Sequence, residues 1–74
     1  MNYTPAAIGE LIKRTRRSLG LTQEDVALTS NTGLRFIIEL EHGKATCEVG
    51  KVLDVLNALG ITVTLTPPQK GHSD

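Results

Sequence analysis

Apolar positions recur at the spacing of amphipathic helices along most of the chain. A first helix is predicted after Thr4 as N-cap, with Pro5 at its first position, and its apolar stripe follows Ile8, Leu11, Ile12, Thr15 and Leu19. A second helix begins after Thr22, which forms a capping box with Asp25 and places Val26 and Ala27 inward. A third covers residues 34–41, with Ile37 and Leu40 inward. A fourth is predicted over residues 47–59 with Thr46 as cap, and we expect these residues in its core face: Val49, Val52, Leu53, Leu56 and Leu59.

Short breaks of small and polar residues separate these helices. Gly20 follows the first helix, where a left-handed C-terminal cap is wanted, and Gly43 and Gly60 end the third and fourth. The break at residues 30–33 contains Asn31, which tolerates a left-handed conformation, and Gly33, which is an acceptable N-cap. Two short helices around such a turn are typical of the helix-turn-helix unit, whose second helix lies in the DNA major groove. The pattern predicts an all-α domain of four to five helices.

The hydrophobic period changes after Gly60. Residues 61–66 alternate apolar residues with threonine, which is strand periodicity in strand-forming residue types. A single strand has no sheet to join within its own chain, so we expect it to pair with the same strand of a second copy in a C2 dimer. The predicted dimerisation residues are Ile61, Thr62, Val63, Thr64 and Leu65. We therefore divide the chain into a DNA-binding and dimerisation domain, residues 1–66, and a flexible tail, residues 67–74.

Length and cysteine content narrow the class of protein. With 74 residues the chain has room for one domain, which as a monomer would bury only about 60% of its unfolded surface. Dimerisation would increase the surface that the chain buries. A single cysteine, Cys47, excludes an internal disulfide, and neither a signal peptide nor an apolar run of about 20 residues is present. We expect a soluble cytoplasmic protein without a membrane partner.

Charge and candidate chemistry change this interpretation little. The formal net charge is zero, but Lys13, Arg14, Arg16 and Arg17 form a local basic run that could hold phosphates. Cys47 has no base or second cysteine near it in sequence, and His42 and His72 lack ligand spacing. We find no phosphate-cradling glycine loop and no nucleophile constellation. The sequence therefore predicts no enzyme activity, no cofactor and no metal site.

Residues 3–66 resemble the Xre/Cro-type, lambda-repressor-like helix-turn-helix family. The resemblance rests on LGLTQE at residues 19–24 with Ala27, on RFI at 35–37 and on ELEHGK at 39–44. The opening YTP and the strand after the last helix are similar to the HipB-like antitoxin branch in particular. The resemblance implies a dimeric repressor that binds a pseudo-palindromic operator upstream of its own genes. In the HipB-like branch it also implies binding to a HipA-like serine/threonine kinase toxin.

The resemblance also implies roles for single residues. Gln23 would contact phosphate at the start of the second helix, and Arg16 would form an ion pair with Glu41 inside the domain. The third helix would face the major groove, and Lys44, just past it, is a further candidate for phosphate. The predicted DNA-binding set is Gln23, Gly33, Leu34, Arg35, Ile38, Glu39 and Lys44.

Residue chemistry distinguishes the members of this set. Arg35 is the best candidate base reader, because a guanidinium can be bidentate to guanine. Glu39 could accept a hydrogen bond from cytosine, but an acid facing DNA more often repels phosphate. Leu34 and Ile38 stand where the family commonly has polar residues; they can contact thymine methyl groups but supply no hydrogen bonds, which would increase dependence on DNA shape.

Two other functions stay open at this point. The chain could be a stand-alone transcriptional regulator with no toxin partner. It could also be a helix-turn-helix module that now binds proteins, which the neutral net charge would suit.

Overall fold

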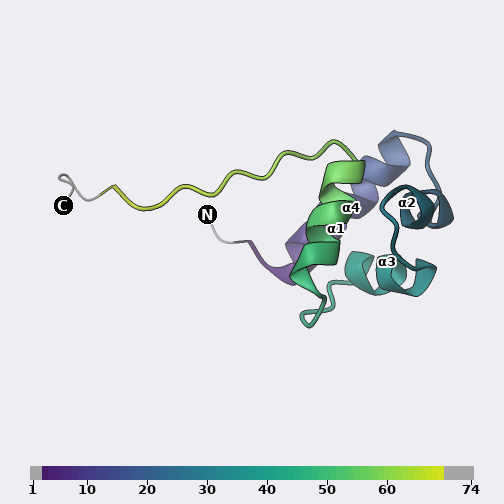
Figure 1. Cartoon of the computed structure of the whole chain (residues 1–74), viewed down its shortest axis with the longest axis horizontal. Coiled ribbons are helices and arrows are strands. Elements are labelled where there is room, and N and C mark those ends of the chain that lie inside the picture. The colour runs from purple at the N-terminus through teal and green to yellow at the C-terminus, as the bar shows by residue number, and fades with distance from the viewer. Residues whose placement is uncertain (1–2, 70–74) are drawn as a thin grey trace.

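The computed structural model describes residues 3–69, which form four helices. In chain order these are α1 (Pro5–Ser18), α2 (Gln23–Thr29), α3 (Leu34–Glu41) and α4 (Val49–Ala58). The helices gather at one end of the molecule, and an extended C-terminal segment leads away from the end of α4 (Figure 1). The predicted all-α class is confirmed, with the helix count at the lower end of the predicted range. Among residues 3–69, none of the helices combines the length and apolarity that crossing a bilayer requires.

Local sequence signals account for the starts of the first two helices. The hydroxyl of Thr4 accepts a hydrogen bond from the Ala7 N–H at 3.0 Å. The hydroxyl of Thr22 accepts one from the Asp25 N–H at 3.0 Å, and the Asp25 carboxylate accepts one from the Thr22 N–H at 2.9 Å. Both halves of the predicted capping box are therefore formed, and each satisfies an N–H that the helix leaves free.

The turn between α2 and α3 is built from the polar residues at 30–33. Asn31 has φ +57°, the left-handed conformation that its short polar side chain tolerates. The Ser30 hydroxyl donates to the Val26 carbonyl at 2.7 Å and lies 2.9 Å from the Thr32 hydroxyl. Gly33 is the N-cap of α3 and contributes no side-chain bond. The turn is thus closed by its own side chains.

The core lies between the four helices and is aliphatic. Ile12, Val26, Ile37 and Val55, one from each helix, are its most deeply buried side chains. Ala27, Leu40, Leu56 and Leu59 complete it, with Ile8, Leu21, Phe36, Cys47, Val52 and Ile61 packed partly against it.

The prediction for α4 was wrong in two respects. The helix begins at Val49 after Glu48 as N-cap, rather than at Cys47 after Thr46. Val49 is 70% and Leu53 47% exposed, although both were expected in the core. Apolar residues occupy more than one face of this helix, and Val55 and Leu56 turn inward with Leu59. The remaining apolar face has no cover within residues 3–69.

A close approach between α1 and α3 explains Gly9. A Cβ added at Gly9 would lie 2.4 Å from the Leu40 carbonyl oxygen, closer than real Cβ contacts allow, and 3.0 Å from that of Glu41. Gly43, with φ +84°, likewise brings the chain against Ala6. The end of α3 therefore packs on the first half of α1. At Gly50, for which the sequence left such a contact open, the nearest atom is 3.9 Å away.

The C-terminal segment is extended but forms no strand within the described residues. The Ile61 N–H closes the end of α4 by donating to the Leu56 carbonyl at 2.9 Å, and Val63 and Leu65 are then 46% and 89% exposed. A strand is defined by pairing, and a single chain offers this segment no second strand. Of the predicted tail, residues 67–69 are exposed, and residues 70–74 lie outside the described residues.

Candidate nucleic-acid interface

A buried ion pair joins the helices beneath the motif. The Arg16 Nε donates to Glu41 Oε2 at 2.6 Å and its Nη2 donates to Oε1 at 3.0 Å, a bidentate arrangement. The side chains are 10% and 3% exposed. Arg16 Nη1 also donates to the Leu21 carbonyl at 2.9 Å. Arg16 of α1 is therefore engaged inside the domain and is not available to DNA.

The same carboxylate also binds the start of α2. Gln23 Nε2 donates to Glu41 Oε1 at 3.0 Å, so one side chain connects α1, α2 and the last residue of α3. Burial raises the pKa of Glu41, but the hydrogen bonds from Arg16 and Gln23 and the charges of Arg16 and Lys13 together lower it below its ordinary value. Glu41 is thus held ionised, and the orientation of α3 against the other two helices is fixed.

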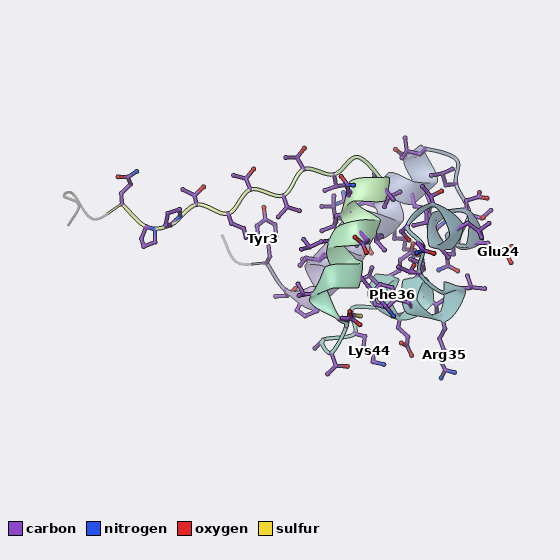
Figure 2. The ribbon with its side chains drawn as sticks, in the orientation of Figure 1. Tyr3, Glu24, Arg35, Phe36 and Lys44 are labelled. Carbon is purple, nitrogen blue, oxygen red and sulfur yellow. The ribbon has the colours of Figure 1, made fainter. Side chains whose placement is uncertain are left out.

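The outward face of α3 is the candidate DNA-reading surface. Leu34 is 41% exposed at the start of the helix, the Arg35 side chain is 91% exposed, and Ile38 is half-buried. Arg35 and Lys44 point out of the same side of the domain, away from Glu24 of α2 (Figure 2). Two cations therefore project from α3 and the loop that follows it. A major groove accepts a helix presented in this way.

Glu39 lies between those two cations. Lys44 Nζ donates to Glu39 Oε1 at 3.1 Å, and Arg35 Nε lies 3.5 Å from Glu39 Oε2. Sequence reasoning treated Glu39 as a base contact or a source of repulsion and missed this bridge. The spacing of Arg35 and Glu39, one helical turn apart, was an available signal.

Gln23 and Gly33 lie at the N-termini of the motif's two helices, α2 and α3. Gln23 is half-buried and turned toward Glu41, so a contact with phosphate stays a prediction for its position at the start of α2. Gly33 is exposed, and a Cβ added there would meet no atom within 4 Å. A phosphate could therefore approach the start of α3 without a side chain in the way.

Other candidate chemistry is sparse among residues 3–69. Cys47 is a half-buried free thiol, and no group of three or more histidine, cysteine, aspartate or glutamate side chains gathers there to hold a metal ion. On α1, Arg14 lies 4.0 Å from Glu10 in an exposed ion pair, so part of the basic run is already compensated. The outward face of α3 is the more distinctive surface.

Comparison with known proteins identifies the family. The model of the family described as "Helix-turn-helix domain" matches residues 9–65. The chain is also 45% identical over 65 residues to the uncharacterized HTH-type transcriptional regulator y4mF of Sinorhizobium fredii. The aligned region covers 88% of this chain and 86% of the relative. The chain belongs to the Xre-type helix-turn-helix family, as its sequence motifs predicted.

Solved structures share the whole fold. One is a complex of HipB with an O4 20mer, and another is a complex of HipA, HipB, O2 and O3. Each matches with a TM-score of 0.81 at 20% identity over 93% of this chain and 97% of the other. The fold is therefore that of HipB. Membership of this family makes the chain a helix-turn-helix transcriptional regulator rather than an enzyme.

Proposed function

We propose that the chain is a dimeric repressor that places α3 in the major groove of a pseudo-palindromic operator. The observation on which this rests is the outward face of α3, where Arg35 projects into solvent beside Lys44 on a helix fixed from below by Glu41. In this arrangement Arg35 reads guanine, Leu34 and Ile38 contact thymine methyl groups, and Lys44, Gln23 and the open approach at Gly33 serve phosphates.

A second copy is the proposed partner of the C-terminal segment. A hollow of about 440 Å³ lies between α4 and this segment, lined by Leu53, Leu56, Asn57, Gly60, Ile61, Thr62 and Val63. Extended backbone without a pairing partner beside uncovered apolar side chains supports a two-stranded sheet between protomers over residues 61–65. Such a C2 dimer would present two copies of α3 to half-sites roughly 34 Å apart.

We further propose that the repressor is the antitoxin of a HipBA-like operon, with a HipA-like kinase as its protein partner. Support comes from the similar structures, which include HipB together with HipA. The 45% identical relative is named only as a transcriptional regulator, which favours a stand-alone regulator as the second candidate. In either role the proposed location of the chain is the cytoplasm. Co-purification of the tagged chain with the product of an adjacent gene separates the two candidates.

Footprinting on the DNA upstream of the chain's own gene, at low and moderate salt, tests the repressor itself. Two protected half-sites spaced by whole helical turns are expected. Affinity should fall steeply as salt rises, because each neutralised phosphate releases a counterion. Absence of protection at both salts, with and without the adjacent gene product, would leave a protein-binding module as the better explanation.

A further inference from the structure

The outward face of α3 contains one carboxylate that is shared by two cations. Each oxygen of Glu39 faces a different partner: Oε1 accepts from Lys44 Nζ at 3.1 Å, and Oε2 lies 3.5 Å from Arg35 Nε. The main chain strengthens the first contact, because the Lys44 N–H donates to the Glu39 carbonyl at 3.1 Å. Lys44 is thus held to Glu39 at two points, and the carboxylate is fixed on one side before it meets Arg35.

The exposures of the three side chains place the acid below the arginine. Glu39 is 33% exposed, Lys44 47% and Arg35 91%. A ligand approaching α3 therefore meets the guanidinium before the carboxylate. The pKa of Glu39 lies below its ordinary value, chiefly because Lys44 donates a hydrogen bond to it, so the acid stays charged at neutral pH.

The atom that Glu39 engages decides which part of Arg35 is free. The carboxylate lies beside Nε, at the side of the guanidinium, and no other hydrogen bond or ion pair to Arg35 is found among residues 3–69. The edge of the guanidinium formed by the two terminal nitrogens, Nη1 and Nη2, is therefore left free on a side chain that is 91% exposed. A bidentate contact to the O6 and N7 atoms of guanine needs two such donors side by side.

We propose that Glu39 is a positioning residue for base recognition: it orients Arg35 toward guanine and, held by Lys44, contacts no base itself. This inference deepens the proposed repressor function and rests on it. An unrestrained arginine has many rotamers, which a base contact must restrict. The Glu39–Lys44 bridge restricts them in advance and also neutralises an acid that would otherwise repel phosphate.

The test is selection of binding sites from a randomised DNA duplex library. Comparing the sites selected by wild type and by Arg35→Ala identifies the base-pair position that Arg35 reads: it is the position at which the variant loses the preference for guanine. Glu39→Gln should lower the guanine preference at that same position by about two- to fivefold, which is part of the discrimination that a whole bidentate contact supplies. Its affinity for random-sequence duplex should be unchanged or higher, because a negative charge has been removed.

Two further variants make the result specific. Glu10→Gln is the matched control, since Glu10 also pairs with an arginine one helical turn away, at 4.0 Å on α1, and its selected site should equal that of wild type. Lys44→Gln should lower the same guanine preference while weakening binding to every duplex. In an Arg35→Ala background, Glu39→Gln should change no base preference, because the residue it orients is absent.

Distinct results would overturn the inference. A guanine preference kept within twofold in Glu39→Gln, with the fold intact by circular dichroism, excludes positioning. Loss of a cytosine preference at another position would make Glu39 a base reader. If wild type enriches sites but Arg35→Ala selects the same ones, the inference fails and the repressor function stands. If wild type enriches no sequence, either alone or with the adjacent gene product, both fail.

Discussion

Loss of the Glu41 charge is the perturbation whose effect the structure defines best. In Glu41→Gln, the Arg16 guanidinium keeps its charge in a site where its side chain is 10% exposed, and no carboxylate faces it. Removing one partner of a buried ion pair costs about 3–5 kcal/mol, because the other charge is left uncompensated. A chain of 74 residues is expected to have a total unfolding free energy of roughly 4–11 kcal/mol. The variant should therefore lose much of its stability.

Urea unfolding followed by circular dichroism measures this loss. All variants are compared at one protein concentration, since the stability of the proposed dimer would depend on concentration. Glu10→Gln makes the same chemical change in the exposed pair with Arg14 and should cost less than about 1 kcal/mol. The double variant Arg16→Met with Glu41→Leu should regain most of the stability, because no unpaired charge is left in the core.

Either of two results would refute this reasoning. If Glu41→Gln is no less stable than Glu10→Gln, the pair does not contribute through its buried charge. If the double variant is as unstable as Glu41→Gln, the loss comes from packing or from the partners at Gln23 and Leu21 rather than from an uncompensated arginine.

Three further predictions concern stability, pH and assembly. Gly9→Ala should lower the free energy of unfolding by about 1–3 kcal/mol through its clash with the Leu40 carbonyl. Gly50→Ala should instead raise it by roughly 0.5–1 kcal/mol, because the added Cβ would meet only Glu48 Oε2, at an ordinary contact distance of 3.9 Å. Equal effects in thermal unfolding would contradict the packing argument. The pKa of Glu41 is lowered in the fold, so the stability that the ionised carboxylate contributes is complete above the ordinary glutamate pKa and is lost as pH falls through the lowered value. The difference in unfolding free energy between wild type and Glu41→Gln should therefore become smaller in acid. A difference that does not change with pH would contradict this prediction. Val63→Pro should shift sedimentation toward monomer, since proline removes a ladder donor, and a fully dimeric variant would exclude strand pairing at this segment.

The sequence predicted those features of the fold that depend on neighbouring residues. The capping box at Thr22, the left-handed Asn31 and the glycines that end the helices follow from local chemistry, and the structure has each of them. The contact of Gly9 with α3 depends on where two helices cross, and no local pattern marks it. The inner face of α4 was misjudged because this helix has more apolar residues than the rest of residues 3–69 covers.

The sequence predicted where the candidate site lies in the fold but not which of its side chains contact one another. The pattern placed Arg35 and Glu39 on one helix, and their spacing permits an ion pair. The return of Lys44 onto Glu39 depends on the path of the chain after Gly43, which a left-handed turn determines. Strand pairing at residues 61–66 requires a second chain, so a single protomer leaves that prediction open.

The buried face of α3 orients the helix, and its exposed face is the surface that a ligand can contact. Glu41, with Ile37 and Leu40, is buried and sets the position of the helix, while Leu34 and Arg35 are exposed and make no contact with the core carboxylate. Substitutions on the outer face should therefore alter which sequence is bound without disturbing the scaffold. The domain is accordingly well suited to acquire new targets during evolution, because a change in the DNA sequence that it binds does not require a new fold.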